Sequence, residues 1–584
     1  MSSNATNGKA PMKLDPITLE IIIARLQELV STMEHLLFHS GYSTILRESH
    51  DGSCTLLDTE GNCIEGSGGP LHLFSYLYTV RSIIDRYPIS TMKDGDCFIS
   101  NDPYLGGTLH VPDVVIITPI FVDGEVLGFS GSHAHKPDVG GLVPGSSGAA
   151  AREIFHEGLI LPGVKFWTKD GVIPEVLAII RHNCRIPEII EGDLRAQVGC
   201  TLVGADQVRA LCKEYGTDTI KAAMPAVLAM SEKRVRDGIE AWPDGEAEAE
   251  AMVDHDGVDL DKPLRIHVKV VKKGRDITFD YSETNDQVKG PTNLRPQVSH
   301  VAAVMALVTM LDPTIPFNDG MRRVIHFINP EGKITNPKWP APINSYFGLA
   351  NVLYSTCNRA LAKFNPSRAV ASPGLGLGAI AVGYDQNRTG RKAVQYELFT
   401  SAQGGKSDHD GSSGTVGFLN VTPNTPVEVI ETEFPIRVKR YEWITDSAGA
   451  GTHRRGIGNR KEYELLGHAT TTLRLGHQFK FGGWGIFDGQ NPPVVRATLN
   501  RGTNHERPLK PLETIRMEPG ETFMVEMPGG GGYGDPKKRP AEEVLEDVLN
   551  SYVSVETAER DYGVAVNPDT MTLDKDRTAS LRGR

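Results

Sequence analysis

Residues 101–141 read NDPYLGGTLHVPDVVIITPIFVDGEVLGFSGSHAHKPDVGG, and this stretch predicts a β-hairpin. Asp123 and Gly124 form a dipeptide that is typical of two-residue hairpin turns, because both residue types tolerate a positive φ. The flanking runs VVIITPIFV and EVLGFSG are rich in the β-branched and aromatic residues that favour strands. We therefore expect Val122 to pair with Glu125 across the turn.

The open end of this hairpin collects polar side chains. If the ladder continues without irregularity, Asp113 lies opposite Ala134, and Asp113 and His135 point to opposite faces of the hairpin. A one-residue bulge, for which the region around Pro119 is suitable, would bring the two side chains onto one face. The sequence therefore predicts that His110, Asp113 and His135 lie close together, and a bulge is the condition for their convergence.

The same segment is rich in the imidazole and carboxylate groups that bind divalent transition metals. Zinc, manganese and iron accept such ligands, so we interpret His110, Asp113 and His135 together as a metal or catalytic site. For His133 the favoured interpretation is an ordinary hydrogen-bonding histidine. Asp138 either orients the imidazole of a metal ligand or caps the glycine turn that follows it.

The composition of the 584-residue chain is typical of a globular protein with several packing units. A net charge of −12 and a pI near 5.9 argue against a nucleic-acid surface as its main purpose. The seven cysteines form no CxxC pair, the N-terminus lacks the apolar core of a signal peptide, and the longest apolar run, residues 301–311, is about half a membrane span. We expect a cytoplasmic protein with no nucleic-acid or membrane partner.

The distribution of patterns along the chain predicts an α+β protein, a mixed multi-layer fold with a long N-terminal helix, a β-hairpin metal site and a β-rich C-terminal part. Asp15 and Pro16 supply a helix cap and a first-turn proline, and apolar residues then recur at spacings of three and four as far as Leu37. The predicted units are a disordered tail over 1–14, a metal-site region with a helical segment over 15–240, a central α/β region over 241–384 and a β-rich region with a short helical tail over 385–584.

Two glycine-rich segments resemble binding loops at first sight. Residues 401–414, SAQGGKSDHDGSSG, form either a substrate loop or second polar site, or a flexible surface loop, and the surface loop is the favoured interpretation. Residues 529–536, GGGGYGDP, lack the Gly-Lys-Ser/Thr that a phosphate-binding loop requires. The chain contains no other nucleotide-binding motif, so ATP, if it is used, must bind to another chain.

Seven segments spread over almost the whole chain resemble those of one enzyme family. They are, in order, DPITLEIIIARL, RESHDGSCTLLD, NDPYLGGTLHVPDV, AHKPDVGG, EGLILPGVKF, EGDLRAQVG and GGGGYGDP. Together they resemble the B-type chain of ATP-dependent hydantoinases. That family also includes caprolactamase, the corresponding half of 5-oxoprolinase, and the α-type subunits of acetone and acetophenone carboxylases.

The resemblance implies a divalent metal held by His110, Asp113 and His135, with Asp51 as a further ligand. Zinc is the favoured ion, and manganese and iron are the alternatives. The chain has GGTLHVPD where many relatives have GGTHLPD, which keeps the H-x-x-D spacing intact. It has AHKPD where many have AHHAD, which removes a histidine beside His135 and changes the surroundings of that ligand.

Further acidic and imidazole groups next to these ligands complete the predicted site. Glu48 and His50 are candidates for moving protons, and the alternative is that they are surface polar residues at the start of a strand. Glu48 and Asp138 are the predicted catalytic residues.

The resemblance also implies a mode of action. A large ATP-binding partner of the hydantoinase A type would phosphorylate a small cyclic amide, a lactam or hydantoin, and metal-bound water on this chain would attack the activated carbon. The implied assembly is an α2β2 hetero-oligomer. One alternative is a subunit of an ATP-dependent ketone carboxylase that uses bicarbonate, and another is a scaffold subunit without catalysis. The length of 584 residues resembles the hydrolases more than the longer acetone carboxylase subunit.

Overall fold

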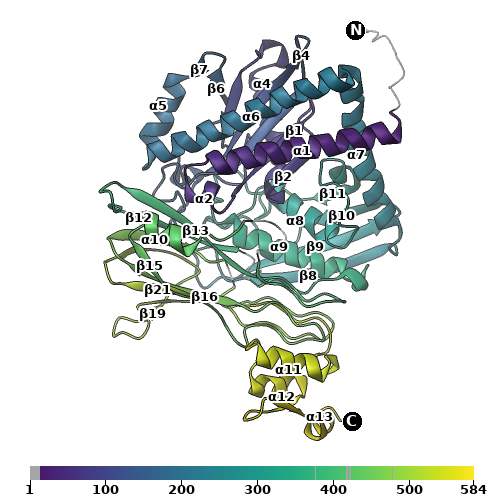
Figure 1. Ribbon diagram of the computed structural model, residues 1–584, viewed down its shortest axis with the longest axis vertical. Helices are drawn as coiled ribbons and strands as arrows, with labels where there is room; N and C mark the ends of the chain where they lie inside the picture. Colours follow the sequence, from purple (N-terminus) through teal and green to yellow (C-terminus); the bar gives the residue numbers. More distant parts are fainter. Residues whose placement is uncertain (1–13, 375–376, 416–418, 420–421, 477, 584) are drawn as a thin grey trace.

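The computed structural model describes residues 14–374, 377–415, 419, 422–476 and 478–583. It confirms the predicted combination of a long N-terminal helix, several sheets and a β-rich C-terminal part (Figure 1). The predicted disordered tail lies outside the described residues, apart from Leu14. Within the described ranges, no helix has both the length and the apolar character that crossing a membrane requires.

Helices cover one face of the N-terminal region (Figure 1). Helix α1 begins where predicted, because the side chain of Asp15 accepts a hydrogen bond of 3.0 Å from the backbone N–H of Thr18. Its apolar residues pack with those of α6 against the first sheet. The helices of this region are α1 (Pro16–Ser40), α2 (Thr44–Arg47), α3 (Pro70–Leu73), α4 (Tyr76–Arg86), α5 (Pro174–Asn183), α6 (Pro187–Tyr215) and α7 (Thr217–Glu240).

A seven-stranded antiparallel sheet lies beneath α1 and α6, with the strand order β2-β1-β5-β4-β3-β6-β7. Because β5 runs antiparallel to both β1 and β4, the starts of β1 and β4 meet the end of β5 at one end of the sheet. The strands are β1 (Gly52–Leu57), β2 (Cys63–Gly68), β3 (Cys97–Ser100), β4 (Asp113–Val122), β5 (Glu125–His135), β6 (Val164–Thr168) and β7 (Gly171–Val172).

The central part combines a four-stranded sheet, of order β11-β10-β9-β8, with two buried helices in one large apolar cluster. A tight turn at Gly274, which has a φ of 60°, joins two neighbouring strands of this sheet. The elements are β8 (Gly245–Val253), β9 (Leu264–Lys273), β10 (Asp276–Asp280), α8 (Pro296–Val308), β11 (Ile325–Ile328) and α9 (Tyr346–Leu361). The N-terminus of α9 lies near the end of the first sheet where β4 begins and β5 ends, since the ring of Tyr346 lies 5.0 Å from that of His110.

Two five-stranded sheets follow, and their inner faces share one hydrophobic cluster. The strand orders are β14-β13-β12-β17-β20 and β15-β16-β21-β18-β19. Strand β12 precedes the predicted boundary at residue 384 but pairs with β13 and β17. The elements are β12 (Leu377–Tyr384), β13 (Ala393–Ala402), β14 (Ser413–Thr415), α10 (Val427–Glu433), β15 (Ile436–Trp443), β16 (Asn459–Leu465), β17 (Ala469–Arg474), β18 (Arg496–Leu499), β19 (Arg507–Pro508), β20 (Leu512–Met517) and β21 (Thr522–Met527).

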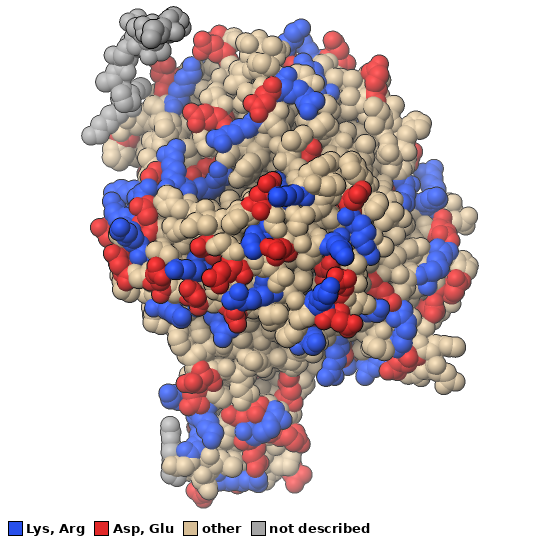
Figure 2. Space-filling view, turned by 180° about the vertical axis from the view of Figure 1, so that it is seen from behind, with Lys and Arg blue, Asp and Glu red and all other residues tan. Residues whose placement is uncertain are grey.

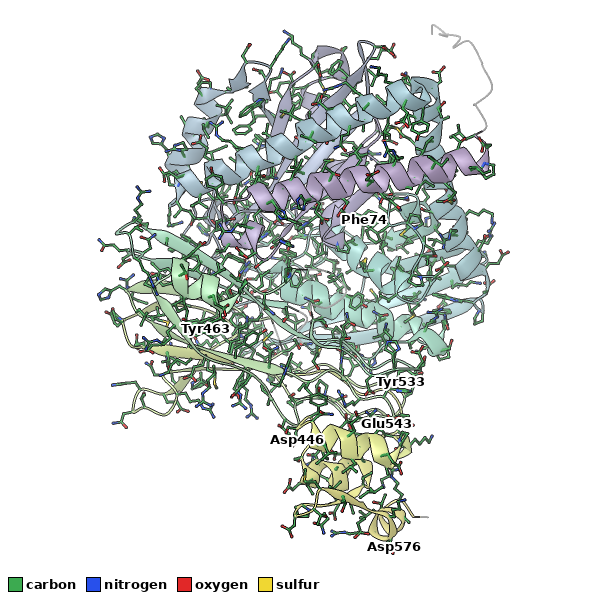
Figure 3. All side chains as sticks on the ribbon, in the orientation of Figure 1. Phe74, Asp446, Tyr463, Tyr533, Glu543 and Asp576 are labelled. Atoms are coloured by element: carbon green, nitrogen blue, oxygen red, sulfur yellow. The ribbon has the colours of Figure 1, made fainter. Side chains whose placement is uncertain are left out.

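A small C-terminal module with its own apolar cluster projects from the body (Figures 1 and 2). Asp446 joins it to the β-rich part by accepting a 2.9 Å hydrogen bond from Ser554 N, near the position where Figure 3 labels Asp446 and Glu543. Acidic and basic side chains are intermixed over the face shown in Figure 2. The elements of the module are α11 (Ala541–Leu549), α12 (Val555–Tyr562), β22 (Ala565–Asn567), β23 (Thr572–Asp574) and α13 (Lys575–Leu581).

Candidate metal centre

The β4–β5 hairpin contains both the predicted turn and the bulge on which convergence depends. Asp123 and Gly124 have φ values of 51° and 86°, as the predicted hairpin turn requires. The register then shifts by one residue between Phe121 and Ile120, next to the region predicted for a bulge. As a result, Asp113 lies directly opposite His135, one residue away from the partner that a regular ladder gives it. Directly opposed residues share a face of the sheet, so both side chains point the same way.

The convergence brings together two overlapping groups of potential ligands. His110, Asp113 and His135 offer ligand atoms that lie within 4.8 Å of one another, and so do His72, Asp113 and His133. The Oδ2 atom of Asp113 is 3.4 Å from His110 Nε2, and its Oδ1 atom is 3.5 Å from His133 Nε2. All five side chains are buried. Asp113 therefore stands at the centre, with one carboxylate oxygen facing each group.

Asp51 lies at the same end of the sheet. Its carbonyl oxygen accepts a hydrogen bond of 3.0 Å from the backbone N–H of His135, and its Oδ1 atom is 3.7 Å from His72 Nε2. Burial, together with the charge of Asp113, raises the pKa of the Asp51 carboxyl to about 8. The structure thus places the fourth predicted ligand beside the other three.

The hydrogen bonds of His110 determine which of its nitrogens faces Asp113. Asn344 donates from Nδ2 to the carbonyl of Ser146, so its Oδ1 atom is the acceptor that faces His110 Nδ1 at 2.7 Å. His110 must therefore carry its proton on Nδ1. In the neutral ring the lone pair is then on Nε2, which faces the carboxylate of Asp113.

His133 is oriented by the same logic. The hydroxyl of Ser75 donates to the carbonyl of His72 at 2.6 Å, so its oxygen is the acceptor for His133 Nδ1 at 3.3 Å. The Nε2 lone pair of His133 consequently faces the second oxygen of Asp113. The rings of His133 and His72 stack with their centroids 4.0 Å apart. Two lone pairs and a carboxylate therefore approach one another without a proton between them.

This arrangement fits a divalent cation. Within the described part of the chain, no hydrogen-bond partner satisfies His110 Nε2, Asp113 Oδ2, His133 Nε2 or either ring nitrogen of His135. Burial alone would raise the pKa of Asp113, whereas positive charge at His110 and His133 would hold that pKa well below its usual value. With lone pairs rather than protons on the two Nε2 atoms, a bound cation would supply that positive charge. Burial lowers the pKa of His135 well below its usual value, so this ring is neutral. An ionised carboxylate with neutral imidazoles is the ligand set that zinc, manganese or iron accepts.

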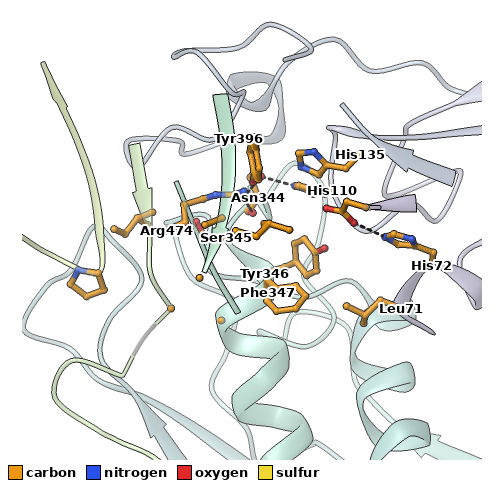
Figure 4. A pocket seen from close by; sticks show the side chains of 18 residues that line it. Leu71, His72, His110, His135, Asn344, Ser345, Tyr346, Phe347, Tyr396 and Arg474 are labelled. Atoms are coloured by element: carbon orange, nitrogen blue, oxygen red, sulfur yellow. Dashed lines mark hydrogen bonds and ion pairs between the residues drawn. The ribbon is translucent and has the colours of Figure 1, made fainter. Parts of the chain in front are cut away.

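The cluster opens into a pocket in which the centre of a water molecule can occupy about 50 Å³ (Figure 4). Strands β13 and β17 and the start of α9 close it from the side opposite the cluster. The polar lining residues are Asp51, His72, His110, His135, Asn344, Ser345, Tyr346, Tyr396 and Arg474, and the larger apolar ones are Leu71, Phe347, Leu398, Pro511 and Leu512. A mixed lining of this kind suits a small molecule with both an apolar and a polar part.

The other sequence-predicted residues do not line this pocket. Glu48 forms an ion pair of 2.8 Å with Arg47. His50 stacks on Phe38, with ring centroids 4.4 Å apart. These positions match the surface-polar alternative for both residues, and neither joins the group around Asp113 among the described contacts.

Asp138 is buried and organises a loop. Its two carboxylate oxygens accept hydrogen bonds from the backbone N–H groups of Gly140, Gly145 and Arg185 and from the guanidinium of Arg185, at 2.9–3.1 Å. These bonds correspond to the turn-capping alternative. No bond from Asp138 to a histidine of the cluster is present among the described interactions.

Five residues that line or support the site were not predicted from the sequence. His72 lies on α3 within the run GGPLHLF, where the glycine and proline boundary before a buried histidine is the only local signal. Three others, Asn344, Tyr396 and Arg474, lie more than 200 residues from His110 in the sequence. No spacing rule connects such distant positions. Glu157, within the quoted segment EGLILPGVKF, supports Asn344 by accepting its backbone N–H at 2.8 Å.

Comparisons with known proteins identify relatives that match nearly the whole chain. A family model described as hydantoinase B/oxoprolinase matches residues 15–536. A protein of Pseudomonas sp. strain NS671, described as the B chain of a D-/L-hydantoinase, is 32% identical over 98% of each chain. The beta chain of the caprolactamase of Pseudomonas jessenii is 30% identical over 95% of this chain and 97% of its own. A crystal structure of ATP-dependent caprolactamase from the same organism superposes with a TM-score of 0.91 at 28% identity, covering 98% of this chain and 100% of that one.

Fold and site thus define a multi-layer α+β protein with a buried histidine–aspartate centre at the end of a β-hairpin. The chain belongs to the hydantoinase B/oxoprolinase family. Its relatives include subunits of both ATP-dependent amide hydrolases and carboxylases, since the acetophenone carboxylase delta subunit of Aromatoleum aromaticum is 26% identical over 98% of this chain and 89% of its own.

Proposed function

We propose that the chain is the metal-dependent subunit of an ATP-dependent hydrolase of cyclic amides, lactams or hydantoins. The observation that carries the proposal is the buried set of unpartnered imidazole and carboxylate atoms that opens into a partly apolar pocket. The relatives described as hydantoinase and caprolactamase subunits support the substrate class, because they match this chain over nearly their whole length.

The proposed ligands are Asp51, His110, Asp113 and His135. We prefer this group to the one that contains His133, because three of its members line the pocket and His133 does not. Zinc is the proposed ion, with manganese and iron as the alternatives that the same ligand set accepts. When bound, such an ion lowers the pKa of water toward neutrality and supplies a nucleophile.

Hydrogen bonds within the chain fix the tautomer of His110 and the position of Asn344. Asn344 fixes the proton of His110 on Nδ1 and so keeps the Nε2 lone pair directed at the centre. Glu157 fixes Asn344 through two backbone hydrogen bonds, of 2.7 Å from Ile343 N and 2.8 Å from Asn344 N. The apolar residues of the pocket exclude water and suit the methylene groups of a ring.

The activation of the substrate is assigned to a separate chain. An unstrained amide is a poor electrophile, and the sequence contains no phosphate-binding loop. We propose a large ATP-binding partner of the hydantoinase A type, in an α2β2 assembly, which phosphorylates the amide oxygen before the substrate reaches the pocket. The hydantoinase and caprolactamase relatives are each named as one of several chains of their enzyme, which supports a hetero-oligomer.

A second candidate is a subunit of a ketone carboxylase, which would use bicarbonate and an activated ketone in the same pocket. The similarity to an acetophenone carboxylase subunit favours it. The two candidates differ in the co-substrate that ATP consumption requires.

The deciding experiment is an ATP-hydrolysis screen of the purified complex with its large partner, together with metal analysis. We expect stoichiometric metal, and ATP consumption that depends on a lactam or hydantoin and produces the ring-opened acid. ATP consumption that requires a ketone and bicarbonate would replace the hydrolase by the carboxylase. A complex that turns over while this chain binds no metal would make the chain a scaffold subunit and overturn the proposal.

A further inference from the structure

Arg474, at the end of β17, is a half-buried cation that lacks an acidic partner among the described residues. It lines the pocket next to Asn344 (Figure 4). No carboxylate of the described residues lies within ion-pair distance of its guanidinium. Burial lowers the pKa of Arg474 only to about 10, so the side chain remains charged at neutral pH. A partly desolvated charge without a counter-charge is unfavourable, and an anionic ligand would supply one.

The hydrogen bonds of Arg474 occupy only one of its nitrogens. Nη1 donates to the backbone carbonyl of Asn344 at 2.6 Å and to its Oδ1 atom at 2.7 Å. Nε is enclosed without any acceptor, and the described residues provide none for Nη2. The Nε–Nη2 edge is the fork that binds carboxylate and phosphate in a bidentate manner. Asn344 thus holds one end of the guanidinium and leaves the anion-binding edge unused.

The position of Arg474 connects it with the metal centre. The Oδ1 atom of Asn344 accepts hydrogen bonds from Arg474 Nη1 and from His110 Nδ1, each at 2.7 Å. The guanidinium also lies over the ring of Tyr396, 5.2 Å from its centroid, and this ring is in turn 4.4 Å from that of His135. An anion on Arg474 would therefore lie beside the cluster rather than at a remote point of the pocket.

A second unpartnered donor lies at the same place. The hydroxyl of Tyr396 is buried and has no hydrogen-bond partner within the described ranges. Tyr396 and Arg474 come from β13 and β17, which both pair with β12, so one sheet holds them together. Donors without acceptors on one wall of a pocket indicate a site for oxygen atoms of a ligand.

We propose that Arg474, held by Asn344 and assisted by Tyr396, binds an oxyanion of the substrate or of its product next to the proposed metal centre. The inference rests on the proposed function, which has an activated, phosphorylated substrate enter this pocket. The ligand group is a phosphoryl group of that substrate or a carboxylate of the ring-opened product, since both offer oxygens to the same fork. If the group is the phosphoryl group, Arg474 selects the activated, anionic substrate over the neutral cyclic amide.

The test measures binding of inorganic phosphate and of acetate to the metal-loaded chain by calorimetry, in the parent and in Arg474→Met. We expect the parent to bind at least one of these anions, and the variant to bind it about 10- to 100-fold more weakly, as expected for loss of charge-assisted hydrogen bonds. Arg516→Met is the matched control. Arg516 lies on the neighbouring strand β20 and forms an exposed pair with Asp385, so its removal leaves anion binding unchanged.

The two anions distinguish the sources of the ligand. An effect on phosphate assigns the site to the phosphoryl group, and an effect on acetate assigns it to the carboxylate. Metal content and the melting temperature are measured for each variant. If Arg474→Met does not fold, Arg474→Lys retains the charge without the fork and should still weaken binding, by a smaller factor.

Equal affinities of the parent and the folded Arg474 variant, or a parent that binds neither anion at millimolar concentration, would overturn the inference. The assay contains no ATP, partner chain or lactam. A complex that fails to hydrolyse lactams would contradict the proposed function while leaving a positive binding result in place, so the two failures are separable.

Discussion

Two groups of charged and polar side chains in this protein differ in whether their polar atoms have partners. Around Asp113, imidazole nitrogens and a carboxylate oxygen face each other without partners. At the base of the C-terminal module, Arg539 meets Asp410 at 2.8 Å and Asp547 at 3.0 Å, and Arg454 meets Asp547 at 2.6 Å. The second network is complete and stabilises structure. The first leaves these atoms unpaired, which is why we propose a cation there, and this difference separates the proposed functional site from a structural network.

The comparison also bears on the loop 401–414, for which the sequence allowed two interpretations. The favoured one is a surface loop, and the other is a substrate loop or second polar site. Its Asp410 belongs to the complete network, because it accepts hydrogen bonds from both terminal nitrogens of Arg539. Asp408 and His409 pair with each other at the surface, with 77% and 56% of their side chains exposed. The loop thus joins the module to the body. Mutation of its exposed residues can distinguish the two interpretations.

The largest effect is expected from His110→Ala. Removal of a ligand that Asn344 holds in one tautomer should abolish metal binding and lower turnover of the complex by more than about 1000-fold, while the subunit still folds. Metal analysis and ATP-coupled turnover provide the measurement. The control is His326→Ala, an exposed histidine on β11 with 58% of its side chain accessible. Full metal content and activity in His110→Ala would refute the assignment of the site.

The next effect is expected from Arg539→Met in the complete network. Loss of this guanidinium leaves Asp547 with Arg454 alone, and breaking such a buried pair typically costs about 3–5 kcal/mol. Hydrogen exchange and limited proteolysis should show opening of residues 541–581, with unchanged metal content. Arg560→Met, which removes an exposed pair with Asp561, is the control. If Arg539→Met lost metal while residues 541–581 stayed protected from exchange, the network around Arg539 would be the functional one, contrary to this assignment.

A smaller, pH-dependent effect is expected from Glu157→Gln. Burial raises the pKa of Glu157 to about 8, so the folded protein keeps this proton where the unfolded chain has lost it. Between about pH 5 and pH 8 the native state binds more protons, and the contribution of Glu157 to stability falls as pH rises, by at most about 1.4 kcal/mol per pH unit.

The glutamine variant removes this slope while its amide oxygen still accepts the bonds from Ile343 and Asn344. Its melting temperature relative to the parent should therefore increase across this pH window. Glu428→Gln, at an exposed position on α10, should show no such trend. A difference between Glu157→Gln and the parent that is the same at every pH would show that Glu157 is ionised in the folded protein.

The smallest effect is expected from Asp408→Ala. Because both partners of the Asp408–His409 pair are exposed, the melting temperature, metal content and turnover should all match the parent. A loss of turnover at unchanged stability would instead favour the substrate-loop interpretation of residues 401–414.

The sequence alone determined the features that depend on near neighbours. The dipeptide Asp123-Gly124 specified the hairpin turn, the cap at Asp15 and the spacing after it specified α1, and the H-x-x-D spacing placed His110 beside Asp113. Such features follow from local backbone preferences and from the periods of helix and strand, which the order of residues expresses directly.

Only the tertiary structure decided how the site is completed. The bulge that turns His135 toward Asp113, and the arrival of His72, Asn344 and Arg474, depend on how separate sheets and helices pack. A one-residue shift in register reverses every side chain of a strand, and contacts between segments hundreds of residues apart follow no sequence period. Local chemistry thus selected the proposed ligands, and long-range packing brought the other residues of the site to them.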